Sequence, residues 1–209
     1  MPTAARITTP RIAAPRTGRP RATTRAELER IGFARFAEQG FEQTTVEDIA
    51  RAAGIARRTF FRYFASKADL VWGDFEAQLS RLRELLEGAP AEVPAMDALR
   101  TAVVEFNRFD DADVPWHRQR MDLILNVPTL QADATLRYAS WRAVVAEFAA
   151  RRAGLPVDSL LPRLVGNAAL GAAMAAYEHW LSTPGSELAD LLHTALARLA
   201  PAFPDLDRA

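Results

Sequence analysis

The chain has 209 residues, 26 basic and 26 acidic side chains, a formal net charge of zero and no cysteine. The lack of cysteine excludes disulfides, thiolate metal sites and cysteine nucleophiles. No apolar run is long enough to span a membrane and the N-terminus lacks the apolar core of a secretion signal, so we expect a cytoplasmic protein.

The charges are divided unevenly along the chain. Residues 1–70 hold 13 Lys and Arg against 7 Asp and Glu, a balance of +6, whereas residues 71–209 hold 13 against 19, a balance of −6. A basic N-terminal third on an acidic body is typical of a head that binds a polyanion and is carried by a domain that does not.

Residues 1–22 are rich in Pro, Arg, Ala and Thr and show no helical period, so we expect a disordered basic arm. Its sequence Gly-Arg-Pro-Arg resembles the arms that place arginines in the minor groove of A·T-rich DNA. Arg19 and Arg21 are therefore candidate DNA contacts. The alternative is a flexible tail whose arginines are only solvated.

The first helix is predicted to begin at Thr24, which forms a capping-box pattern with Glu27, and to end at Gly40. Leu28 and Phe36 belong to an apolar series at helical spacing. This face is expected to pack against the two helices that follow.

Residues 44–70 contain two short helical patterns separated by a glycine turn. Thr45 can cap the first helix, with Asp48 favouring its positive N-terminal end, and Gly54 supplies the positive φ angle of a tight exit. The second helix starts near Ala56 and carries several arginines beside phenylalanines. Two helices across a short turn, the second rich in arginine, indicate a helix-turn-helix that reads the major groove.

The first turn of the second helix carries Arg57 and Arg58, where side chains of this motif reach base edges. An arginine there can bind guanine O6 and N7 together, which gives roughly 1–3 kcal/mol of discrimination. Thr59 can touch a thymine methyl group, and Arg62 follows on the same segment. The alternative is a solvated arginine pair on a surface helix.

The run TTVEDIARAAGI followed by TFFRYFASKADL resembles the DNA-binding domain of the TetR family of one-component bacterial regulators. In that family the turn ends in Ala-Gly, and the recognition helix leads into Tyr-Phe, a short gap and a lysine. The matching positions are Ala53-Gly54, Tyr63-Phe64 and Lys67.

The resemblance extends over residues 24–70 and implies that Thr45, Tyr63 and Lys67 contact phosphates, which fixes register without reading sequence. Ala56 stands where the family usually has serine. The recognition helix therefore lacks a hydroxyl N-cap, an effect of roughly 1 kcal/mol.

A narrower resemblance, which covers most of the chain, is to regulators of the mycofactocin redox-cofactor system, through RRTFFRYF, VEFNRF, VPWHRQRMDLIL and TLRYASWRAVVAEF. This resemblance implies a transcriptional repressor, a homodimer on operator DNA that a small-molecule effector releases, with control of mycofactocin-related redox genes. An architectural or partner-controlled DNA binder without a ligand is the alternative. We expect a basic arm at 1–22, a DNA-binding domain at 23–70 and a ligand-binding and dimerisation domain at 71–209.

The C-terminal two thirds show helical periods and no strand pattern, so the fold is predicted to be all-α, with about nine helices in total. A long helix is expected from Ser66 to near Gly88, followed by a linker to Pro94. Later helices are expected to begin near Met96, Pro115, Pro128, Asp158 and Ser186.

The segment LVGNAALGAAMAAYEHWL is apolar nearly all round, which favours burial on every side, and its small residues would let a partner helix approach. We therefore predict a dimer interface from the last two helices. The alternative is a central helix wrapped within one subunit. The predicted interface residues are Ala168, Ala172, Ala175, Leu188, Leu192 and Leu196.

In the family the fifth to eighth helices enclose the effector, so polar and aromatic side chains on their apolar faces are candidate ligand contacts. The candidates are Phe106, Asn107, Trp116, His117, Met121, Trp141, Arg142, Phe148 and Tyr177. Nearby arginines could meet an anionic head group at a pocket mouth, which favours an amphipathic anion such as an acyl-CoA. The alternative is that they pair with neighbouring aspartates. These arginines are Arg118, Arg120, Arg137 and Arg142.

The three histidines, His117, His179 and His193, are scattered without partners at metal-ligand spacing, so we expect no metal and no other cofactor. No catalytic Ser/His/Asp set, phosphate-binding glycine loop or carboxylate pair can be placed. We therefore do not expect an enzyme.

Overall fold

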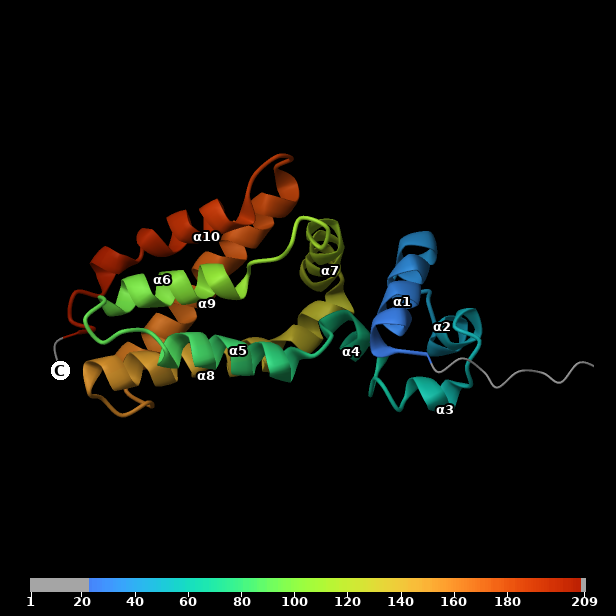
Figure 1. Cartoon of the computed structure of the whole chain (residues 1–209), viewed down its shortest axis with the longest axis horizontal. Coiled ribbons are helices and arrows are strands. Elements are labelled where there is room, and N and C mark those ends of the chain that lie inside the picture. Colours follow the sequence, from blue (N-terminus) through green and yellow to red (C-terminus); the bar gives the residue numbers. More distant parts are fainter. Residues whose placement is uncertain (1–22, 208–209) are drawn as a thin grey trace, which may run out of the picture.

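The computed structural model describes residues 23–207, which fold into helices without any strand (Figure 1). The predicted arm with Arg19 and Arg21 lies outside these residues. The α-helices are α1 (Arg25–Gln39), α2 (Val46–Ala52), α3 (Arg57–Phe60), α4 (Lys67–Trp72), α5 (Phe75–Glu87), α6 (Ala95–Phe106), α7 (Val114–Asn126), α8 (Pro128–Ala153), α9 (Leu160–Ser182) and α10 (Leu188–Ala197), and a 3₁₀ turn follows at Ala200–Ala202. The predicted all-α class is confirmed. None of the described helices is long and apolar enough to cross a membrane.

Helices α1, α2 and α3 form the DNA-binding end of the molecule around a core of large side chains (Figure 1). Phe33 and Phe60 are completely buried, and Phe64 is nearly so. Thr45 caps α2 as predicted, and together with Asp48 it forms a capping box, in which each side chain bonds the backbone N–H of the other. The short helices of this end are therefore held by caps and by one aromatic core.

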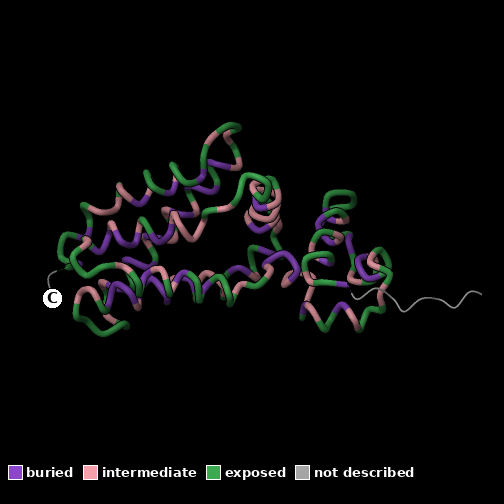
Figure 2. The backbone as a smooth tube through the Cα atoms, in the orientation of Figure 1, coloured by how far each residue is buried: buried purple, intermediate pink, exposed green. Residues whose placement is uncertain are grey.

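The opposite end is a bundle of α5, α6, α8, α9 and α10, whose inner faces are buried (Figures 1 and 2). Helices α8 and α9 are the longest, and they pack against each other along their length. Gly166 of α9 makes this approach possible, because a Cβ there would lie 2.7 Å from the carbonyl oxygen of Arg142 in α8.

The single helix predicted from Ser66 to Gly88 is wrong, because the chain breaks at Gly73. Gly73 has a φ of 65°, which ends α4, and Asp74 then caps α5 by accepting the Ala77 N–H at 3.2 Å. The apolar pattern continues through the break, so periodicity alone did not reveal it. The break accounts for the additional helix.

Helices α4 and α7 and the first turns of α8 lie between the two ends (Figure 1). Trp116 of α7 packs on Phe33 of α1 with ring centroids 4.3 Å apart. Leu70 and Trp72 of α4 belong to the same cluster of contacts. The hydrophobic core of the DNA-binding end therefore continues through α4 and α7 into the first turns of α8.

Candidate DNA-binding and effector sites

The recognition helix α3 exposes its two arginines differently. Arg57 is paired with Glu47 of α2 at 2.6 Å and lies over the Phe61 ring, 5.1 Å from its centroid. Arg58 is exposed and makes no hydrogen bond or ion pair with any residue that the structure describes. Arg58 is therefore free to approach a base, whereas Arg57 must first leave Glu47.

Helix α3 is shorter than predicted, with regular α-helix only from Arg57 to Phe60. Ala56 provides no side-chain cap, as expected, and the Thr59 and Arg62 N–H groups bond carbonyls only three residues back. Thr59 is half-buried, and Arg62 is exposed with its guanidinium 5.7 Å from the Tyr63 ring centroid. The absence of a cap is consistent with a recognition segment that is tightly turned and short.

Two residues predicted to bind phosphate have partners within the subunit. The Tyr63 hydroxyl donates to the Thr23 carbonyl at 2.7 Å, so its proton is already used. The Lys67 ammonium donates to the carbonyls of Phe41 and Thr44, at 2.5 and 2.9 Å, and burial lowers its pKa. Both side chains therefore hold the turns around the helix-turn-helix together, and their contacts with phosphate stay a prediction.

A cavity of about 150 Å³ is lined by residues from all the helices from α4 to α9. Six of the nine predicted ligand contacts line it, so the sequence located the region. The cavity is lined by Trp72, Phe75, Gln78, Phe106, Asn107, Phe109, His117, Arg120, Met121, Ile124, Tyr138, Trp141, Leu170, Ala173, Met174 and Tyr177.

A chain of hydrogen bonds forms one polar wall of this cavity. Asn107 Nδ2 donates to the Val103 carbonyl at 2.7 Å, so its Oδ1 accepts the Tyr177 hydroxyl proton at 2.5 Å. A phenol has one proton, so Tyr177 must accept from His117 Nε2, which lies 2.8 Å away. Burial and the charge of Arg120 lower the pKa of His117 to about 3, so its imidazole is neutral at physiological pH.

Three other lining residues carry buried polar atoms without a hydrogen-bond partner: Trp72 Nε1, Arg120 Nε and the Tyr138 hydroxyl. Burial also raises the pKa of Tyr138 to about 12, so the phenol keeps its proton. Leaving such groups unpaired is costly, and most buried polar groups in proteins are paired. Three residues of the cavity wall therefore each carry a buried donor without a partner.

Three predicted ligand contacts lie elsewhere, and these predictions were wrong. Trp116 packs on α1, as described above. Phe148 is 2% exposed in the bundle core. Arg142 is at the close contact of α8 with Gly166 and does not line the cavity.

The arginines predicted at a pocket mouth do not lie together at the cavity. Arg118 donates to the Leu181 carbonyl at 3.3 Å, and Arg137 pairs with Asp69 and Asp133. The alternative of pairing with neighbouring aspartates is therefore correct for Arg137 alone. Arg120 is the arginine that lines the cavity.

Several lining residues were missed by the sequence reasoning. Tyr138 precedes Trp141 by three residues on α8, and Met174 precedes Tyr177 by three on α9, so helical spacing could have found both. Trp72 gave no such signal, because its position depends on the break at Gly73.

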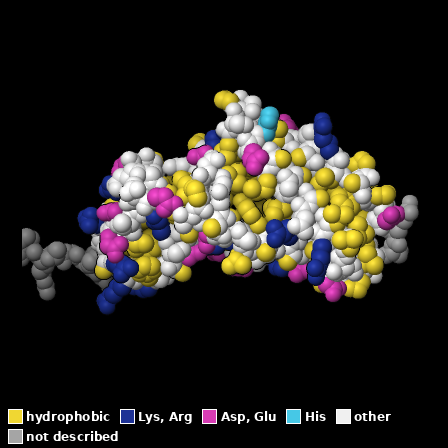
Figure 3. Space-filling model, turned by 180° about the vertical axis from the view of Figure 1, so that it is seen from behind, with side chains coloured by type: hydrophobic (Ala, Val, Ile, Leu, Met, Phe, Trp, Pro, Cys, Tyr) yellow, Lys and Arg dark blue, Asp and Glu magenta, His cyan; other side chains and the backbone are white. Residues whose placement is uncertain are grey.

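Helix α9 leaves one face uncovered by its own subunit. Five of its exposed residues follow helical spacing along one face: Leu160, Leu164, Asn167, Gly171 and Ala175. Leu160 and Leu164 are 80% and 50% exposed. The other exposed residues of α9 are Arg163, Glu178, His179 and Ser182. Hydrophobic side chains gather over the bundle on the side opposite the view of Figure 1 (Figure 3).

The predicted interface residues divide between this face and the core. Ala175 is exposed, whereas Ala168 and Ala172 are half-buried against the subunit's own core. Leu188, Leu192 and Leu196 are wrong as partner contacts, because they are 7%, 0% and 0% exposed within one subunit. The apolar stripe of α10 covers α6 and α9 instead.

Comparison with known proteins agrees with this arrangement. Residues 32–71 match the family of bacterial regulatory proteins of the tetR family, and residues 93–204 match the MftR C-terminal domain. The chain is 45% identical, over 85% of its own length and 89% of the relative's, to a Mycobacterium tuberculosis protein assigned as the mycofactocin biosynthesis transcriptional regulator MftR.

Two solved structures share the fold at low sequence identity. FadR from Thermus thermophilus, a TetR-family repressor in complex with lauroyl-CoA, has a TM-score of 0.54 and 22% identity, covering 85% of this chain and 93% of that one. FadR from Bacillus halodurans, a fatty acid degradation regulator, has a TM-score of 0.63 and 17% identity, covering 85% and 98%. These relatives are regulators and not enzymes. The chain belongs to the TetR family of bacterial transcriptional regulators, with a C-terminal domain of the MftR type.

Proposed function

We propose that this regulator is a homodimeric repressor that holds its operator through α3 and leaves it when a small molecule occupies the cavity. The observation that carries the proposal is the position of that cavity. Trp72 lines it from the end of α4, and the same helix contributes Leu70 to the core of the DNA-binding end. A ligand that changes the shape of the cavity can therefore shift α4 and, through it, the position of the recognition helix.

The exposed face of α9 supports the dimer. An exposed series that includes large leucines and small residues favours close packing against a second copy of the same helix. A two-fold dimer also suits a helix-turn-helix, because paired recognition helices meet successive major grooves about 34–36 Å apart. The boundary near residue 70 then separates the part that reads DNA from the part that pairs and senses.

An alternative regulator without a ligand would need a filled core in the C-terminal bundle. The cavity among these helices favours a ligand-responsive protein instead. The 45% identity to the MftR relative supports mycofactocin-related redox genes as targets.

The effector is an amphipathic anion, and an acyl-CoA is the first candidate, since a structural neighbour was solved with lauroyl-CoA. The cavity volume of about 150 Å³ is close to that of a cavity that holds benzene, so a long acyl chain would have to displace its walls. We expect an acyl-CoA to weaken operator binding and free coenzyme A to leave it unchanged. A gel-shift titration with acyl chains of increasing length measures this, and no release at any length would eliminate acyl-CoA as the effector.

A further inference from the structure

Phe61 is an aromatic residue that the DNA-binding end leaves uncovered. It is 41% exposed, whereas every other Phe, Trp and Tyr in the described part of the chain is buried or half-buried. The other large hydrophobic residues exposed in that part of the chain lie in α8, in α9 and in the loop between them. A single exposed hydrophobic side chain is ordinary in itself, so its position in the fold decides what it can do.

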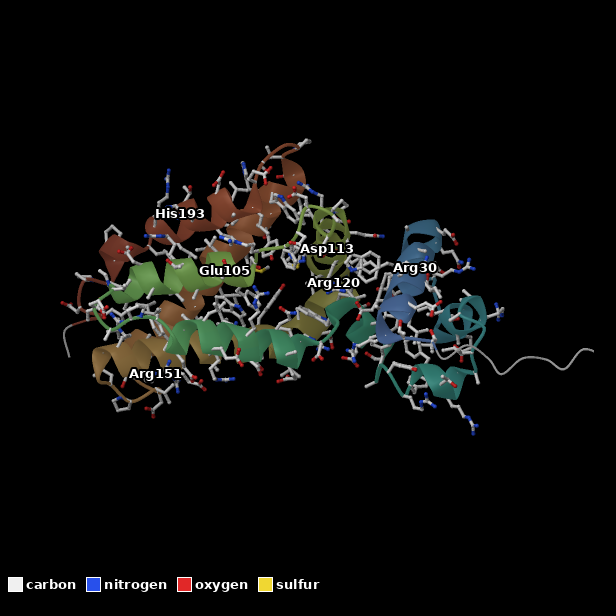
Figure 4. All side chains as sticks on the ribbon, viewed as in Figure 1. Arg30, Glu105, Asp113, Arg120, Arg151 and His193 are labelled. Carbon is white, nitrogen blue, oxygen red and sulfur yellow. The ribbon has the colours of Figure 1, made fainter. Side chains whose placement is uncertain are left out.

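Phe61 shares a face of the recognition segment with Arg58. The Phe61 N–H bonds the Arg57 carbonyl at 3.3 Å, so the helical turn that begins at Arg57 continues to Phe61. Residues three apart on such a turn are neighbours on one face, which places the Phe61 ring beside Arg58. Figure 4 shows side chains of α3, at the lower right, extending away from α1 and α2 and out of the molecule. The exposed ring therefore belongs to the surface proposed to enter the major groove.

The Phe61 ring is held on two sides. It meets the Phe60 ring edge to face, with centroids 5.5 Å apart and planes at 89°, and Phe60 is completely buried. The Arg57 guanidinium lies over the Phe61 ring, 5.1 Å from its centroid. Both kinds of contact are favourable, so they fix the ring while leaving part of it exposed. A side chain that is already fixed loses little conformational entropy when it meets a partner.

We propose that Phe61 contacts the C5 methyl group of one thymine in each half-site of the operator. This inference rests on the proposed function and adds a second specificity-determining residue to α3, beside Arg58. Thr59, the residue expected from sequence to touch a thymine methyl, is half-buried, so the exposed ring is better placed for this contact.

Thymine follows from the chemistry of the ring. A phenyl side chain carries no hydrogen-bonding group, so it cannot pair with the polar edges that the bases present in the major groove. The C5 methyl of thymine is the apolar group on those edges, and phenylalanine is among the side chains that contact it. Burying one methyl group raises affinity about fourfold, and a dimer that buries one in each half-site gains about 15-fold.

Uridine scanning of the operator tests the contact, because deoxyuridine pairs as thymine does and lacks only the C5 methyl. The probe is the duplex that the full chain enriches from a random pool, with uridine at one symmetric pair of thymines at a time. We expect one pair to lower the affinity, measured by fluorescence anisotropy, about 15-fold. An enriched duplex in which no thymine methyl matters would overturn this inference alone. A pool without any enriched duplex would overturn the proposed function as well.

Variants at position 61 assign the contact to this ring. Phe61→Ala should bind the thymine and uridine duplexes equally, whereas Phe61→Tyr, which keeps the ring, should keep the difference. The control is Thr59→Ser, which removes the methyl group of the other candidate and should also keep the difference. Each comparison is made within one variant, so a general loss of affinity does not affect it. A uridine effect that persists in Phe61→Ala, or that Thr59→Ser abolishes, would overturn the role of Phe61.

Discussion

Gly171→Arg is expected to convert the dimer into monomers and to abolish tight operator binding. Gly171 lies on the exposed face of α9, and a Cβ there meets no atom within 4 Å in its own subunit. An isolated subunit therefore has room for a side chain at position 171, whereas a partner helix packed closely on this face would leave no room for it. Burying an unpaired guanidinium between two helices would also cost more than the interface can supply.

Sedimentation velocity and operator titration measure the effect of Gly171→Arg. Loss of the second recognition helix should weaken operator binding by about 10²–10⁴-fold, because a single half-site loses the gain from simultaneous engagement. Circular dichroism should show an unchanged helix content. Ser80→Arg, on the exposed side of α5, adds the same charge and should remain dimeric. A Gly171→Arg protein that stays dimeric would place the interface elsewhere.

Arg58→Ala is expected to remove base-specific recognition while leaving the dimer intact. Arg58 is the exposed arginine in the first turn of α3, and Arg57 beside it is held by Glu47. A lost bidentate contact to guanine costs roughly 1–3 kcal/mol, and a dimer loses one at each half-site, so operator affinity should fall at least about tenfold. Preference at one base position of each half-site should relax at the same time.

Fluorescence anisotropy with operator and with random DNA separates base reading from charge. Arg30→Ala removes a positive charge from an exposed position of α1, outside the helix-turn-helix. It should weaken binding to operator and to random DNA to a similar extent, and by less than Arg58→Ala weakens operator binding. If Arg58→Ala shows this same pattern, Arg58 contacts phosphate and reads no base.

The helix-turn-helix could be predicted from sequence because its signals are local. The capping box of Thr45 and Asp48, the positive φ of Gly54 and the buried Phe60 are each determined by a few neighbouring residues. The roles of Tyr63 and Lys67 were not predictable in this way, since their partners lie 23 to 40 residues away in the chain.

The C-terminal domain shows where sequence patterns stop being sufficient. Asn107, His117 and Tyr177 could be proposed as ligand contacts because polar groups on apolar helix faces are unusual. An apolar stripe on a helix can be covered by the same subunit or by a partner, and the sequence does not distinguish the two. Leu192 was therefore assigned to a partner, although its own subunit buries it. The role of Trp72 depends on the turn at Gly73 and required the structure.

Selection of binding sites from a random duplex pool by the purified full chain tests most directly whether this protein is a dimeric, sequence-specific regulator. Paired recognition helices predict enriched sites with two inverted half-sites whose centres are about 34–36 Å apart, or a multiple of this spacing. Enrichment of a single, unrepeated half-site, or of no sequence at all, would contradict it.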